Sequence, residues 1–191
     1  MTTAMVLDKK WKHITVDHTG RRGNPFDFGA GFLNPTGVLN PGLVYNAQSE
    51  DYKAFLCSVG YDEKSLHLVT GDNSTCNKRI YQSAVDLNYP SISVSNLRDS
   101  YSVTRTLTNV GRPRSIYKAF WSSPVGINVT VSPKILVFNK YGEKVNFTVN
   151  FKVSAPSKGY IFGTLTGRRG KLRVSSPLVV RVVSSDSGLL R

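Results

Sequence analysis

The sequence lacks a hydrophobic run long enough to cross a membrane. No stretch of about 18 apolar residues occurs anywhere in the 191 residues. The opening residues, Met1 to Asp8, are too few and too soon charged to form a secretory signal peptide. We therefore expect neither a membrane span nor a signal peptide in this chain. Hydrophobic residues still make up 40% of it and charged residues 19%, which favours a packed core over disorder.

Residues that commonly carry catalysis or bind metals are scarce. The chain has three histidines, His13, His18 and His67, and no Gly-x-Ser-x-Gly nucleophile motif. Asp17 and His18 have the residue types of half a catalytic triad, but adjacent residues rarely point at one another. Acidic residues are scattered, no His/Cys group has metal-ligand spacing, and Gly29-Ala30-Gly31 lacks the rest of a nucleotide-binding motif. We therefore predict no catalytic residue, no metal ligand and no cofactor.

Cysteine is also rare, and the two cysteines, Cys57 and Cys76, admit two interpretations. They are either two unpaired buried thiols or one disulfide. A disulfide here would close a short loop and stabilise the fold by roughly 3 kcal/mol in the chain-entropy model. Cys76 lies in a polar, turn-rich segment, where a buried thiol would be unusual. The sequence around Cys76 therefore favours the disulfide.

Acidic residues are few, and the resulting positive charge is uneven. The chain has 12 Asp and Glu against 25 Lys and Arg, and its formal net charge is +13. Residues 86–191 hold sixteen of the basic residues and only four acidic ones, so two regions of different character meet near residue 85. The closest basic groups, Arg112 with Arg114 and Arg168-Arg169 with Lys171, fall at predicted hairpin tips.

This charge has three explanations. Nucleic acid fits poorly, because the basic residues are mostly spread singly and no stacking-aromatic motif of an RNA-binding sheet occurs. An acidic polysaccharide such as pectin fits better, through long-range attraction that salt would screen. A solvated basic surface with no partner is the simplest explanation.

The hydrophobic pattern changes from helical to alternating along the chain. Ser49 precedes an apolar face of four residues that predicts a helix over residues 49–60, and a second short helix follows from Asp62 to Leu68. From Asp86 onward the period is two, typical of half-buried strands. The predicted strands are Ile92–Val94, Tyr101–Val110, Ile116–Trp121, Ile127–Val131, Ile135–Phe138, Val145–Val153, Tyr160–Thr166 and Leu172–Val183. About eight short strands in roughly 100 residues indicate a β-sandwich.

Several motifs, in one order, resemble the plant-type subtilisin-like serine proteases (subtilases). The opening run of the resemblance is typical of the end of their peptidase domain: Phe26-Asp27-Phe28-Gly29-Ala30-Gly31, Asn34-Pro35 and Pro41-Gly42-Leu43-Val44-Tyr45. The others resemble their connecting helix and their C-terminal domain: Glu50-Asp51-Tyr52, Phe55-Leu56-Cys57, Asp86 to Ile92, Arg105 to Gly111, Gly159 to Gly163 and Ser176 to Val182. The chain departs from the family pattern at Phe32, at Asn46 and in the hairpin Gly167-Arg168-Arg169-Gly170.

The resemblance implies a mainly β fold: a fibronectin type III-like β-sandwich preceded by a short α-helical connector and a remnant of an α/β subtilisin-like peptidase domain. The implied boundaries are residues 1–45 for the remnant, 46–85 for the connector, 86–183 for the sandwich and 184–191 for a tail. The resemblance also implies that Cys57 and Cys76 are bonded. The remnant would lack the strands and helices of the peptidase domain against which its apolar residues pack. We therefore expect poor order or aggregation over residues 20–45.

For function, the resemblance implies the C-terminal portion of a secreted serine endopeptidase whose Asp, His and Ser triad lies before residue 1. The family's Gly-Thr-Ser-Met motif is absent here, so we expect an inactive supporting domain, whose partner is the missing catalytic domain and which meets protein substrates only through it. A stand-alone basic module that binds acidic cell-wall polysaccharide is the alternative. Secretion of the parent would make N-glycosylation of Asn73, Asn128 and Asn146 possible, since each begins an Asn-x-Ser/Thr sequon.

Overall fold

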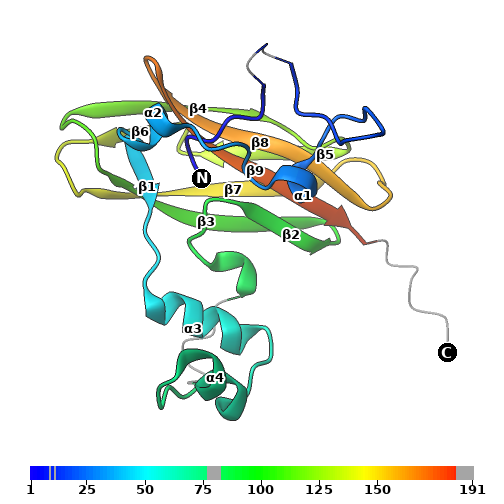
Figure 1. Cartoon of the computed structure of the whole chain (residues 1–191), viewed down its shortest axis with the longest axis vertical. Coiled ribbons are helices and arrows are strands. Elements are labelled where there is room, and N and C mark those ends of the chain that lie inside the picture. The colour runs from blue at the N-terminus through cyan, green and yellow to red at the C-terminus, as the bar shows by residue number, and fades with distance from the viewer. Residues whose placement is uncertain (9, 11, 77–82, 184–191) are drawn as a thin grey trace.

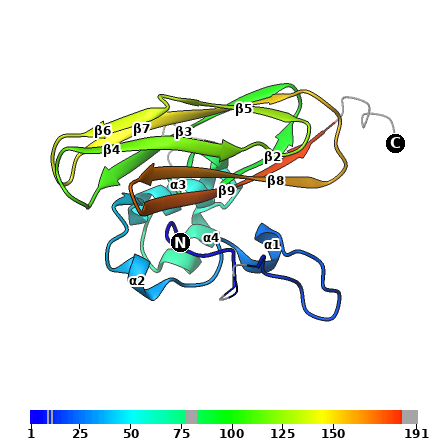
Figure 2. The same cartoon turned by 90° about the horizontal axis from the view of Figure 1, so that it is seen from above.

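Two β-sheets packed face to face form a sandwich in the computed structural model, which describes residues 1–183 except 9, 11 and 77–82 (Figures 1 and 2). One sheet has four strands in the order β1-β3-β7-β5, and the other has five in the order β2-β9-β8-β4-β6. Neighbouring strands are antiparallel except β2 and β9, which are parallel. The strands are β1 Leu43–Tyr45, β2 Ile92–Leu97, β3 Ser100–Asn109, β4 Ser115–Ser122, β5 Ile127–Ser132, β6 Ile135–Phe138, β7 Lys144–Val153, β8 Tyr160–Arg169 and β9 Leu172–Val182.

The alternating sequence pattern predicts these strands well. All eight predicted strands occur, and β7 buries Phe147, Val149 and Phe151 on its inner side as expected. Strands β2 and β8 each run three residues past their predicted ends, β2 to Leu97 and β8 to Arg169; the sequence predicts that β8 ends before Gly167. There the strand continues because Gly167 still pairs with Ala119 and Val174, and the chain turns only at Gly170, whose φ is +54°. The tail predicted for residues 184–191 lies outside the described residues.

The core lies between the two sheets and is built from their inward-facing side chains. Tyr117, Phe138 and Phe151 are its largest fully buried members. The rings of Tyr117 and Phe138 meet edge to face with centroids 6.0 Å apart, an arrangement that aromatic pairs favour. Burial of this apolar surface is the main stabilising contribution to the sandwich.

Strand β1 belongs to the sandwich, although the sequence places its residues in the preceding 1–45 segment. Leu43 lies opposite Asn109 of β3, and its side chain is fully buried in the core. The tight turn before it requires Gly42, which has φ +75° and no room for a side chain, since a Cβ would lie 2.4 Å from the Tyr117 hydroxyl. The hydroxyl of Tyr45 then hydrogen-bonds Ser176 of the other sheet at 2.8 Å. Residues 43–45 are therefore fixed by both sheets.

The N-terminal segment lies on the outer face of the five-stranded sheet (Figure 2). It contains two single-turn helices, α1 Pro25–Phe28 and α2 Pro35–Val38. The backbone N–H of Ser175 in β9 donates to the carbonyl of Thr2 at 2.8 Å, and the ring of Phe26 packs edge to face on Tyr160 and Phe162 of β8. Other apolar side chains of this segment are exposed: Phe32, Leu33, Val38 and Leu39.

A helical excursion separates β1 from β2. It contains α3 Ser49–Ser58, α4 Glu63–Thr70 and the 3₁₀ turn η1 Ala84–Asp86. Helix α3 begins at Ser49, and its cap is Gln48, whose backbone N–H donates to the Asp51 carboxylate at 2.7 Å. Helix α4 begins after Asp62 and ends two residues beyond the expected Leu68, at Thr70.

Candidate functional site: a clipped helical excursion beside the sandwich

The helical excursion leaves and re-enters the sandwich at one place (Figure 1). The side chain of Asn88 joins the two ends there. The side-chain oxygen of Asn88 accepts the backbone N–H of Thr106 at 2.9 Å. Its amide nitrogen donates to the carbonyls of Thr106 and of Asn46, both at 3.0 Å. Pairing of β1 with β3 ends at Tyr45 and Leu107. At the next residue of β3, Thr106, the Asn88 amide bonds the backbone N–H and C=O in the way that a neighbouring strand would.

A buried arginine fixes the returning chain to the same strand. Arg105 of β3 is only 3% exposed. Its guanidinium donates to the carbonyls of Val85 at 2.7 Å and Thr104 at 3.0 Å, and burial lowers its pKa. Charge and hydrophobic pattern do not predict this burial, because Arg105 is one more scattered basic residue in the sequence. Only its position within the family motif Arg105 to Gly111 sets it apart.

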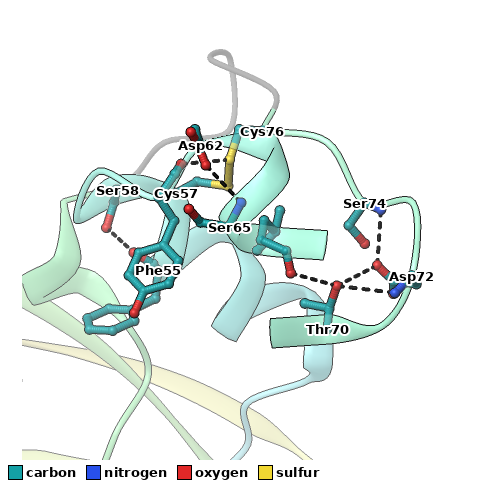
Figure 3. The surroundings of a disulfide bond; sticks show 11 residues. Phe55, Cys57, Ser58, Asp62, Ser65, Thr70, Asp72, Ser74 and Cys76 are labelled. Atoms are coloured by element: carbon teal, nitrogen blue, oxygen red, sulfur yellow. Dashed lines mark hydrogen bonds between the residues drawn. A yellow bond between two sulfur atoms is a disulfide. The ribbon is translucent and has the colours of Figure 1, made fainter. Parts of the chain in front are cut away.

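A disulfide closes the excursion on itself (Figure 3). It joins Cys57 near the end of α3 to Cys76 beyond α4, over a sequence separation of 19. The pairing agrees with the implication of the family resemblance and excludes the two free thiols. Leu66 of α4 is the one described residue of the two helices that is fully buried, so the small helical unit has little core of its own and depends on the covalent link.

The loop inside the disulfide is organised around Asp72 (Figure 3). Its carboxylate accepts hydrogen bonds from the Lys53 ammonium at 2.7 Å, the Thr70 hydroxyl at 2.8 Å and the Ser74 backbone N–H at 3.0 Å. Lys53 also contacts Glu50 at 3.2 Å. These contacts hold the pKa of Asp72 far below its usual range, and the hydrogen bond from Lys53 contributes most to this lowering.

We expect acid to weaken the chain through Asp72. Because its folded pKa lies below the unfolded value of about 3.9, the unfolded chain takes up a proton first as the pH falls. The stabilisation is therefore complete above about pH 5 and is lost progressively below about pH 4. Thermal unfolding at pH 7 and pH 3 should show a smaller drop in melting temperature for Asp72→Asn than for the wild type. An equal drop in both proteins would contradict a contribution from Asp72.

The three sequons are placed on the surface, and their use stays a prediction. Asn73 lies in the exposed loop after α4, and Asn128 and Asn146 lie on the outer side of β5 and β7. On that face, hydroxyl and amide side chains pair across the strands, and the Thr106 hydroxyl donates to the oxygen of Asn146 at 2.8 Å. All three asparagines are exposed to solvent.

The histidines do not gather into a site. His18 and Asp17 are fully exposed in a turn, with 4.0 Å between the ring and the carboxylate. His67 lies on α4, where its ring contacts the carbonyl of Asp72. Within the described ranges, no group of three His, Cys, Asp or Glu side chains has the arrangement of a metal site, and no helix is long and apolar enough to span a bilayer.

The sandwich is fibronectin type III-like. Residues 86–180 match the family model for the fibronectin type-III domain, in agreement with the two-sheet architecture. The solved structure of SSP-19, an MSP-domain protein of Caenorhabditis elegans, aligns with 48% of this chain at 12% identity and a TM-score of 0.34.

The chain as a whole is related to plant subtilisin-like proteases. It is 42% identical over 185 residues to subtilisin-like protease SBT3.8 of Arabidopsis thaliana, and the alignment covers 95% of this chain. It is 43% identical over 186 residues to subtilisin-like serine-protease S of Lotus japonicus, over 97% of this chain. The chain therefore belongs to the plant subtilisin-like protease family, and it spans about a quarter (24%) of the length of these relatives.

Proposed function

We propose that this chain is the accessory portion of a secreted subtilisin-like serine endopeptidase and supports a catalytic domain that it does not itself contain. The proposal is supported chiefly by how the residues before the sandwich pack against it. Residues preceding β1 lie against the outer face of one sheet, through Thr2 and Phe26, and β1 then enters the other sheet. A domain attached before residue 1 would thus be held against the sandwich rather than tethered loosely.

In this proposal peptide-bond hydrolysis belongs to the attached catalytic domain, and protein substrates meet this chain only through it. Secretion and glycosylation at Asn73, Asn128 and Asn146 form part of the same proposal. The exposed apolar residues of the N-terminal segment, Phe32, Leu33 and Leu39, would be covered by the catalytic domain.

A chimera tests the supporting role. The Lotus japonicus relative is produced with this chain in place of its matching region, and also as a version that lacks that region. We expect the chimera to cleave casein and to react with a fluorophosphonate serine probe, and the truncated version to do neither. The isolated 191-residue chain should stay unlabelled. Full activity of the truncated version, or labelling of the isolated chain, would contradict the proposal.

A further inference from the structure

Three turns meet at one end of the sandwich, on the side of α2 (Figures 1 and 2). They are residues 111–114 between β3 and β4, residues 139–143 between β6 and β7, and residues 168–171 at the β8–β9 hairpin. We call this surface the basic end. Its five exposed cations are Arg112, Arg114, Lys140, Arg168 and Lys171. Residues far apart in the sequence are thereby brought to one surface.

Buried polar contacts hold two of these turns together. Asn109, at 0% exposure, donates from its amide nitrogen to the carbonyls of Arg112 and Lys140, both at 3.1 Å. The backbone N–H of Arg114 donates to the carbonyl of Asn139 at 3.2 Å. The cations of the first two turns are therefore presented by a fixed scaffold.

The third turn is attached through Arg169. Its guanidinium contacts the Ser115 hydroxyl at the start of β4 and lies over the ring of Tyr117, 5.5 Å from the centroid. Arg169 thus serves the packing of the hairpin, while its neighbours Arg168 and Lys171 are exposed.

The positive charge of the basic end is only partly balanced, because the three turns carry five exposed cations and one carboxylate, that of Glu143. None of its five cations lies within ion-pair distance of a described carboxylate. The nearby carboxylate of Glu143 is engaged by the backbone N–H groups of Asn139 and Lys140. Uncompensated charge at close quarters opposes folding and favours an anionic partner.

Like charges also lie side by side on the adjoining sheet face. Lys118, Arg168 and Arg173 occupy neighbouring positions across β4, β8 and β9. Like charges directly opposite each other on a sheet are destabilising. Burial, and then the charge of Arg168, lower the pKa of Arg173.

The backbone at Arg114 is strained in the same place. Its φ is +51°, in the left-handed region that residues other than glycine rarely adopt. Strained backbone persists where the surrounding structure fixes it, and it gathers at binding and catalytic sites. Charge repulsion and backbone strain thus coincide at this end of the sandwich.

We propose that the basic end binds a linear polyuronate, an acidic polysaccharide that carries a carboxylate on each sugar. Arginine guanidinium groups match carboxylates through paired N–H donors, and the three turns can bind successive carboxylates of one chain. Single-stranded nucleic acid fits less well, because Tyr141 is the one aromatic residue in the three turns. The nearby ring of Phe120 has the cations of Arg168 at 5.4 Å and Lys118 at 5.7 Å over it. The surface therefore offers charge without the row of stacking rings that successive bases require.

Two charge-matched variants of the whole 191-residue chain test the proposal. One carries Arg112→Gln, Arg168→Gln and Lys171→Gln at the basic end. The control carries Arg98→Gln, Lys152→Gln and Lys158→Gln near the opposite end, where Ser100 pairs with Lys152. Binding to de-esterified polygalacturonate is measured by calorimetry at about 0.1 M salt. We expect about tenfold weaker binding for the first variant and less than about twofold for the control.

A third variant separates binding from folding. Arg114→Gly removes one cation and the left-handed strain together, so we expect weaker binding with an unchanged or higher melting temperature. The proposal is overturned if wild type fails to bind, if both triple variants lose affinity equally, or if fully methyl-esterified polymer binds as well. Tighter binding of a single-stranded oligonucleotide that depends on the same residues would reassign the surface to nucleic acid. None of these readouts depends on the protease assignment.

Discussion

Replacing Asn88 with alanine is expected to lower the free energy of unfolding by about 2–3 kcal/mol, because one side chain satisfies three backbone groups. The substitution leaves the N–H of Thr106 without an acceptor in a partly buried position, and it releases the two ends of the helical excursion from each other. Urea unfolding followed by circular dichroism measures the change.

Asn96→Ala is the matched control for this substitution. Asn96 is exposed on β2, and its side chain makes no hydrogen bond to a described residue, so its loss should change stability by less than about 0.5 kcal/mol. Similar losses in the two variants would show that the Asn88 contacts do not stabilise the fold.

Removing the disulfide by Cys57→Ala with Cys76→Ala is expected to destabilise the helical excursion by about 3 kcal/mol while leaving the sandwich folded. The effect should stay local, because the closed loop runs from the end of α3 through α4 and contains no strand of either sheet. Hydrogen exchange should then show lost protection in α3 and α4 and unchanged protection in β3 and β7.

Reduction of the wild type supplies the control for the two alanine substitutions. A reducing agent breaks the same bond without changing any other side chain, so the exchange pattern should match that of the double variant. Loss of protection throughout β3 and β7 would instead mean that the excursion and the sandwich unfold as one unit.

The sequence predicts the sandwich well because most of its strands alternate. Strands β3 to β7 bury one face, and in β7 the period-two pattern marks the buried residues Phe147, Val149 and Phe151 directly. The ends of strands are harder to predict. Gly167 resembles a turn residue in the sequence, yet its place between Ala119 and Val174 keeps it in β8.

The contacts that join the segments were less predictable, because they depend on long-range geometry. Three residues, Leu43–Tyr45, are too short to show a pattern, so β1 could not be separated from the segment before it. The disulfide followed from the family resemblance, whereas the burial of Arg105 and the three bonds of Asn88 left no local pattern. The sequence shows basic residues at predicted hairpin tips but does not predict that these tips meet at one surface. The burial of Asn109, which joins two of the turns, has no local sequence pattern either.

Strand β1 has a consequence for where the domain can be cut. A protein made from residues 86–183 alone would match the family model and would still be incomplete, because β1 lies 41 residues before it. Removal of β1 turns β3 into an edge strand with unpaired N–H and C=O groups and leaves a hole in the core where Leu43 was buried. Such an edge is a template for pairing with another chain. In the intact protein the strand that covers it comes from the other side of the helical excursion, from the N-terminal segment.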